Sequence, residues 1–81
     1  MMDRADILKK VNALFVETLD NEDIVLTDAT TANDVAEWDS LNHIQLVVDV
    51  EKAFGIRFSS REIQTWKNVG EMINSIIAKI K

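Results

Sequence analysis

The sequence contains no cysteine and no proline, and its 81 residues include only two glycines. Without cysteine there can be no disulfide, no thiolate nucleophile and no cysteine zinc site. Because His43 is the single histidine, a histidine metal cluster is excluded too, and we expect no bound metal. Any thiol chemistry would have to come from outside the polypeptide. The shortage of proline and glycine favours helices throughout the chain.

Long apolar runs and clustered basic residues are also missing. No run approaches the roughly 20 apolar residues that span a bilayer, and the start MMDRADILKK lacks the pattern of a secretory signal. We therefore expect a cytoplasmic protein with no membrane span. A formal charge of −5 argues against nucleic acid as a partner and suits a basic protein partner. With 47% hydrophobic and 28% charged residues, we expect a single folded domain over residues 1–81.

Apolar residues recur at helical spacing in two long segments of the first two thirds of the chain. The first segment predicts a helix from Asp3, which is placed to cap it, to about Leu19. The second predicts a helix over residues 41–54, with Asp39 as its N-cap and Gly55 as its stop.

Two capping patterns predict the remaining helices. Ser59 and Glu62 have the spacing of a capping box and predict a helix of one or two turns that ends near Trp66. Asn68 and Glu71 resemble a second capping box, before the apolar stripe of the last helix. The predicted fold class is all-α: a bundle of three longer helices and one short helix, with a long loop between the first and second helices.

The loop, residues 20–38, shows no sustained periodicity. Because a structureless loop of this length is unusual in a small domain, we expect apolar side chains to attach it to the helices. The candidates are Ile24, Val25, Leu26 and Val35. Trp38 is expected to pack the end of the loop onto the bundle, and Trp66 to close the core near the short helix.

The second helix carries two apolar arcs on a helical projection. One arc, Leu46, Val47, Val50 and Phe54, can face the core. The other, Leu41, Ile44 and Val48, has no obvious use inside so small a bundle, although a central helix could bury both arcs. Polar residues separate the arcs on one side, namely Asn42, Gln45, Asp49 and Lys52.

Ser40 falls in the first turn of this helix, where unpaired amides and the helix dipole favour an anionic group such as a phosphate. Ser40 has no base to make it a nucleophile, because His43 lies on the same helix and points toward the core arc. His43 is therefore interpreted as a satisfied helix residue, and Asp39, Asp49 and Glu51 as a cap and solvated charges. We find no activated nucleophile, metal-ligand set or phosphate-binding loop, so we expect no enzyme and no catalytic residue.

The run DSLNHIQLVVDVEKAFGIRFS, residues 39–59, resembles the phosphopantetheine attachment region of acyl carrier proteins. The similarity continues through WKNVGEMINSI in the last helix and, more loosely, covers nearly the whole chain. It implies that Ser40 bears a covalent phosphopantetheine arm, flanked by Asp39 and Leu41. The arm would carry acyl groups as thioesters and would supply the thiol that the sequence lacks.

The resemblance also implies partners and a surface that binds them. The partners would be a phosphopantetheinyl transferase, acyl-loading enzymes, and acyl-transfer or condensing enzymes. We expect the protein itself to be a monomer, because a carrier must pass between its partners. The implied docking residues are Leu41, Asn42, Ile44, Gln45, Val48, Glu51 and Lys52. In carriers of fatty-acid synthesis this helix is strongly acidic, whereas the matching positions here are Asn42, Gln45, Glu51 and Lys52, of which only Glu51 keeps the charge. Further positive charge comes from Arg57, Arg61 and Lys67. We therefore expect a carrier for a specialised lipid or polyketide-type pathway.

Two other functions remain open at this point. An aminoacyl carrier, of the peptidyl or alanyl kind, would use the same arm for another cargo. An unmodified helical adaptor would bind a partner through Leu41, Ile44 and Val48, with Ser40 acting only as part of the cap; its function would survive Ser40→Ala.

Overall fold

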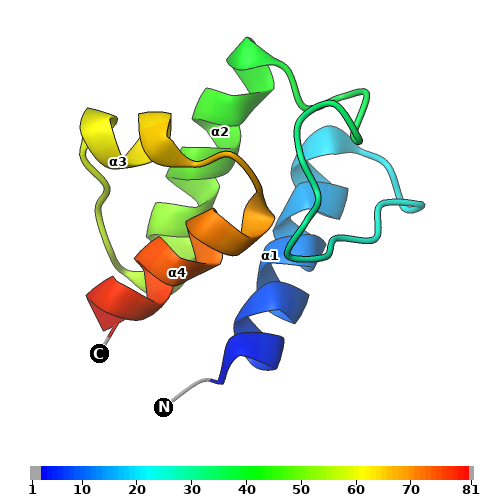
Figure 1. Cartoon of the computed structure of the whole chain (residues 1–81). Coiled ribbons are helices and arrows are strands. Elements are labelled where there is room, and N and C mark those ends of the chain that lie inside the picture. Colours follow the sequence, from blue (N-terminus) through cyan, green and yellow to red (C-terminus); the bar gives the residue numbers. More distant parts are fainter. Residues whose placement is uncertain (1–2, 81) are drawn as a thin grey trace.

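The computed structural model describes residues 3–80, and of Ser40 it describes the backbone. Four helices follow one another along the chain (Figure 1): α1 (Arg4–Leu19), α2 (Ser40–Phe54), α3 (Ser60–Thr65) and α4 (Val69–Ile80). Helix α1 packs against both α2 and α4, and α3 packs against α4. The predicted all-α bundle of three longer helices and one short helix is confirmed.

Side-chain caps begin the first three helices where the sequence predicts them. The Asp3 carboxylate accepts the Asp6 N–H at 2.9 Å, and the Asp39 carboxylate accepts the Asn42 N–H at 2.8 Å. Ser59 begins α3 with a complete capping box. Each cap satisfies amides that a helix start otherwise leaves unpaired.

The start of α4 differs in one respect from the predicted capping box. The Asn68 side chain accepts the Glu71 N–H at 2.9 Å, as predicted. The Glu71 carboxylate, however, accepts the N–H of Lys67 and not that of Asn68. The reciprocal bond is therefore displaced by one residue toward the preceding turn.

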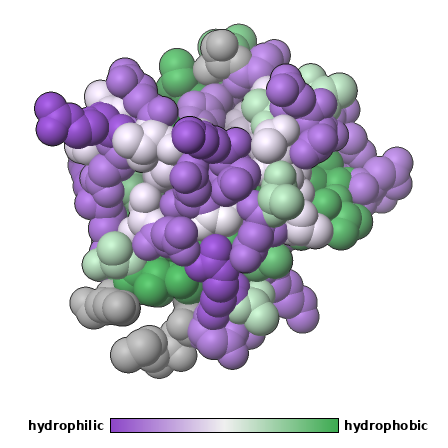
Figure 2. Space-filling view, viewed as in Figure 1, coloured by the Kyte–Doolittle hydropathy of each residue, from purple (hydrophilic) through white to green (hydrophobic). Residues whose placement is uncertain are grey.

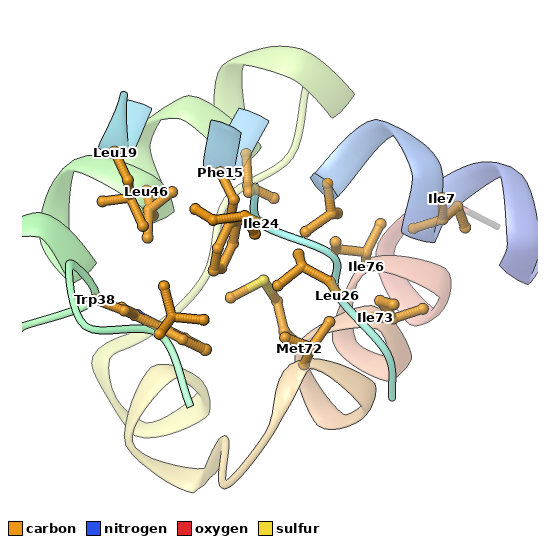
Figure 3. Close-up of a cluster of buried hydrophobic side chains, with 14 residues drawn as sticks. Ile7, Phe15, Leu19, Ile24, Leu26, Trp38, Leu46, Met72, Ile73 and Ile76 are labelled. Atoms are coloured by element: carbon orange, nitrogen blue, oxygen red, sulfur yellow. The ribbon is translucent and has the colours of Figure 1, made fainter. Parts of the chain in front are cut away.

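The core lies between α1, α2 and α4, and Figure 3 shows its side chains converging from these helices and from the loop. Ile7 and Phe15 of α1, Leu46 of α2, and Met72 and Ile73 of α4 are fully buried. Each such side chain stabilises the fold by about 1.5–3 kcal/mol relative to an exposed one. The apolar stripes seen in the sequence thus meet in one cluster.

The loop between α1 and α2 covers the core with only part of its predicted set of apolar residues. Ile24, Leu26 and Val35 are buried, as expected. The prediction for Val25 is wrong, because its side chain is 80% exposed. With Ile24 and Leu26 directed inward on either side of it, Val25 faces solvent.

Hydrogen bonds attach the loop to both α1 and α4. Asn12 of α1 donates its amide to the carbonyl of Ile24 at 3.2 Å and accepts the N–H of Leu26 at 2.6 Å. At the start of α4, the N–H of Val69 donates to the carbonyl of Thr30 at 2.9 Å. These bonds provide partners for loop backbone groups that would otherwise be unpaired in a partly buried segment.

Arg4, the first residue of α1, joins α1, the loop and α4. Its guanidinium donates to Asp28 of the loop at 3.1 Å, to Asn74 of α4 at 2.6 Å, and to the carbonyl of Gly70 at 3.1 Å. The Gly70 N–H donates to the Asp28 carbonyl at 2.9 Å. The planar, multiply donating guanidinium suits such a junction.

Polar side chains dominate the face of the molecule that is drawn in Figure 2. Figure 2 shows hydrophilic groups over most of this face, with hydrophobic residues emerging as separate small groups. Among residues 3–80, no helix has the length and apolar character that crossing a membrane requires.

Candidate functional site

The start of α2 is held by Asp39, whose backbone is extended (φ −105°, ψ −176°). Its carboxylate accepts the Asn42 N–H and its carbonyl accepts the His43 N–H, each at 2.8 Å. Ser40 is the first helical residue, so it occupies the positive end of the helix dipole. The side chain of Ser40, on which the attachment prediction falls, lies outside what the structure describes.

A chain of aromatic contacts runs behind this helix start. Trp38 is buried and donates its indole N–H to His43 Nδ1 at 2.9 Å, with the two rings stacked. The edge of Trp38 meets Phe15 in the core, with ring centroids 4.9 Å apart. On the other side, His43 meets Trp66, which packs on Phe58 at 4.8 Å. The start of α2 is thereby fixed to both the core and the α3 region.

The environment of His43 favours its neutral form. Desolvation by burial lowers the pKa of His43 below its ordinary value of 6.5. Because Nδ1 accepts the Trp38 N–H, the neutral ring carries its proton on Nε2. The interpretation of His43 as a satisfied helix residue is confirmed, as is the packing role of Trp38.

A pocket of about 460 Å³ opens beside the helix start. Its lining combines aromatic and charged side chains: Ala32, Trp38, Asp39, His43, Trp66 and Lys67. It joins the loop, the first turn of α2 and the α3–α4 connection. The sequence predicted that Trp66 closes the core and that Lys67 adds positive charge, but it did not indicate that either residue lies next to Asp39.

The two apolar arcs of α2 face opposite environments. Leu46, Val47 and Val50 are buried, whereas Leu41 and Ile44 are 78% and 65% exposed. The last member of the outer arc, Val48, is half-buried. The sequence left open whether both arcs are buried; in the structure the first arc faces the core and the second is exposed at Leu41 and Ile44, while its use in docking stays a prediction. In Figure 2, hydrophobic side chains emerge at the top of the molecule, where α2 begins.

Several polar side chains on α2 have structural partners that the sequence did not indicate. The interpretation of Asp49 and Glu51 as solvated charges is wrong, because both are half-buried and hydrogen-bonded. Asp49 accepts from Thr18 of α1, and Glu51 accepts the Phe58 N–H at 2.8 Å. Asn42 donates its amide to the Glu37 carbonyl at 2.8 Å.

Two of the predicted polar docking residues remain turned to solvent, as the apolar Leu41 and Ile44 do. Gln45 and Lys52 are exposed, and Gln45 donates to Asp49 at 3.0 Å along the helix. Because Asn42 and Glu51 also hold the fold, a change at either residue would alter more than a surface.

Comparison with known proteins identifies the family. Residues 9–76 match the family model described as "Phosphopantetheine attachment site". The chain is 36% identical over 81 residues to the acyl carrier protein of Cyanidium caldarium, covering 99% of this chain and 93% of that protein. This chain is a member of the acyl carrier protein family. It is also similar to the acyl carrier protein of Thermotoga maritima, with 28% identity over 80 residues and 99% of each chain covered.

A solved structure of an acyl carrier protein supports the same family assignment and the same fold. The solution structure of the holo acyl carrier protein of Geobacter metallireducens has a TM-score of 0.86 and 38% sequence identity to this chain. The similarity covers 91% of this chain and 85% of that one. The prosthetic group of this acyl carrier protein is therefore a covalently attached phosphopantetheine. Members of the family carry intermediates and are not catalysts.

The start of α2 fits a phosphate ester of this kind. A helix N-terminus is favourable for phosphate, because its amides and dipole attract negative charge. The Asp39 carboxylate is held by the Asn42 N–H, and Lys67 adds a cation to the same pocket. The carrier thus combines an anion-favouring helix start with an adjacent, partly aromatic pocket.

Proposed function

We propose that Ser40 is the attachment residue, and that the protein carries acyl groups as thioesters between partner enzymes of a specialised lipid or polyketide-type pathway. The observation that carries the proposal is the position of Ser40. It opens α2 directly after the Asp39 cap and before the exposed Leu41, inside the segment that matches the attachment-site family.

The side chains around Ser40 would orient the arm and limit its contact with water. The helix dipole of α2 and Lys67 favour the phosphate, while the Trp38 and Trp66 rings offer apolar surface beside it. When bound, phosphopantetheine supplies the thiol that forms the thioester. The pocket of about 460 Å³ would shelter the part of the arm or cargo nearest the helix.

Docking of partner enzymes is assigned to the outer arc of α2. Leu41 and Ile44 expose large apolar side chains in the turn and a half that follows Asp39. Burying such side chains against a partner removes apolar surface from water and so favours binding. The partners in this proposal are a phosphopantetheinyl transferase, an acyl-loading enzyme, and an acyl-transfer or condensing enzyme.

An intact-mass measurement tests the attachment. The protein is incubated with coenzyme A and a broad-specificity phosphopantetheinyl transferase, and the mass should rise by one phosphopantetheine. Ser40→Ala should show no gain. Ser60→Ala is the matched control, because Ser60 also opens a helix next to its cap, and it should gain the same mass as the native protein. Modification of Ser40→Ala, or loss of modification in Ser60→Ala alone, would contradict the assignment.

A binding comparison tests the specialised pathway. The modified protein and a strongly acidic fatty-acid carrier are titrated against the same generic fatty-acid ketosynthase. We expect weaker binding of this protein, because Asn42, Gln45 and Lys52 do not supply the negative charge that meets a basic partner. Equal affinity would show that the protein serves general fatty-acid synthesis.

A further inference from the structure

The charges of this protein are divided unevenly along the chain. Residues 1–39 hold ten acidic and three basic residues, a formal charge of −7. Residues 40–81 hold four acidic and six basic residues, a formal charge of +2. The second segment therefore has a formal charge opposite in sign to that of the whole molecule, and its positive excess comes from residues 66–81.

The four acidic side chains of this second segment are turned toward the protein's own groups. Asp49 and Glu51 are bonded to Thr18 and to the Phe58 N–H, as described above. Glu62 completes the α3 capping box and forms an ion pair with Lys79 at 3.0 Å. Glu71 accepts the Lys67 N–H. All four are half-buried, and each has a hydrogen-bond or ion-pair partner within the protein, so they are less accessible to a docking partner than exposed carboxylates.

The basic side chains of the same segment point outward. Lys52, Arg57, Arg61 and Lys67 are exposed, and among residues 3–80 none of them lies within ion-pair distance of a carboxylate. Such charges act on an approaching partner, because a nearby potential steers association even where its contribution to affinity is modest. Residues 40–65, which contain α2 and α3, hold three acidic and three basic residues, so their formal charges balance, but the three basic side chains are the exposed ones.

A hollow lies where the exposed apolar arc of α2 meets these cations. It has a volume of about 440 Å³ and is lined by Val48, Glu51, Lys52, Gly55, Ile56 and Arg57. Val48 belongs both to this hollow and to the outer arc, and Lys52 follows it by four residues on the same helical face. Val48 and Ile56 give the hollow apolar lining, with Lys52 and Arg57 among its walls.

We propose that this hollow and the adjoining arc dock a partner segment in which an apolar side chain is flanked by carboxylates. The inference rests on the proposed function, because it assigns the chemistry of a partner to the face through which the carrier docks. An apolar side chain would contact Val48 and Ile56, and its flanking carboxylates would pair with Lys52 and Arg57. The formal charge of the whole chain suits a basic partner, whereas the hollow has two exposed cations, Lys52 and Arg57, against the half-buried Glu51 and suits an acidic one.

Two helical peptides can test the proposal on the isotope-labelled, full-length protein. They share a leucine face and differ only in whether glutamate or lysine flanks it. In an NMR titration at low ionic strength, the acidic peptide should bind at least about tenfold more tightly than the basic one. It should shift the amides of Val48, Lys52, Ile56 and Arg57, and the preference should shrink as salt is added.

Charge reversal supplies the matched control. Arg57→Glu should remove most of the preference for the acidic peptide. Lys9→Glu changes the net charge by the same amount on α1, and it should leave the preference unchanged. Both residues are exposed, so neither change empties the core. Equal binding of the two peptides, tighter binding of the basic peptide, or no binding at this hollow would overturn the inference.

The outcome is separable from that of the proposed function. Peptide binding needs no arm, and attachment is scored by mass on Ser40. If the peptides show the charge preference but Ser40 is not modified, only the proposed carrier function is contradicted. If Ser40 is modified but the peptides show no charge preference, only this inference is contradicted.

Discussion

Single side chains on α2 serve both the fold and the surface. Glu51 lies on the helix that meets partners, yet one of its oxygens accepts the Phe58 N–H at 2.8 Å. This bond holds the chain that leaves α2 through Gly55, whose φ of +65° reverses the backbone there. A change of binding after mutation of Glu51 would therefore combine a lost charge with an altered turn.

Replacement of Glu51 with alanine should lower the free energy of unfolding by about 1–3 kcal/mol, because a hydrogen bond to a charged group is lost. Glu51→Gln keeps an oxygen acceptor and should lose less. Urea titration followed by circular dichroism measures both. Lys52→Ala, on the exposed neighbour, is the control and should stay within about 0.5 kcal/mol of the native protein. Equal stability of all three variants would show that the Phe58 amide does not depend on Glu51.

His43 gives the fold a dependence on pH that can be assigned to one ring. Burial lowers the pKa of His43 in the folded protein below the 6.5 of an exposed imidazole. Its contribution to stability is therefore complete above pH 6.5 and is lost as the pH falls through the lower, folded pKa. Protonation of Nδ1 would also remove the acceptor of the Trp38 indole N–H.

The melting temperature of the native protein should consequently fall more on acidification from pH 7.5 to pH 5 than that of His43→Gln. Carboxylates titrate in both proteins, so the difference between the two curves isolates His43. Because His43 is the single histidine, its NMR titration needs no assignment. Parallel curves, or a titration midpoint above 6.5, would contradict the structural explanation.

At the scale of elements, the loop is held by contacts to two helices. Asn12 bonds its backbone at Ile24 and Leu26, while α4 bonds it at Asp28 and Thr30. Gly70 permits the close contact between the loop and α4, because an added Cβ would lie 2.9 Å from the Asp28 carbonyl oxygen. The loop positions Trp38 and Asp39, so its attachment determines where α2 begins.

Gly70→Ala tests that close approach. In an unobstructed helix, alanine in place of glycine stabilises by up to about 1 kcal/mol. Here the added methyl group must displace backbone, and we expect a net loss of about 1–3 kcal/mol, as in other overpacked sites. Thermal unfolding measures the sign, and hydrogen exchange of the loop amides shows whether the loop is released. A stabilised variant with unchanged loop exchange would contradict the close contact.

For the whole molecule, the surface is suited to transient contacts. The large apolar side chains that are strongly exposed among residues 3–80 are Val25, Leu41 and Ile44. Val25 lies in the loop, and the other two lie within one turn of α2. Stable homodimers cover larger and more apolar interfaces.

We therefore expect a monomer. Sedimentation equilibrium should give a mass near 9.2 kDa for the unmodified chain over a wide range of concentrations. Leu41→Ser combined with Ile44→Ser should not change that mass. A concentration-dependent dimer that these substitutions dissociate would show that a second copy covers the docking arc.

Local sequence determined most of the secondary structure and the position of the candidate site. Caps at Asp3, Asp39 and Ser59 act on amides three residues away, so they could be recognised without a fold. The apolar arcs of α2 depend on helical spacing alone. For the same reason, Ser40 could be placed at a helix start from a short stretch of residues.

Tertiary structure alone decided which residues the loop buries, which charges remain exposed, and what lies beside Ser40. Val25 proved exposed because the loop backbone turns Ile24 and Leu26 inward. Asp49 and Glu51 found partners 31 and seven residues away in sequence, and Lys67 came to share a pocket with Asp39. Such pairings depend on how the helices pack against one another, and the local sequence around a residue does not indicate which distant residues it will contact.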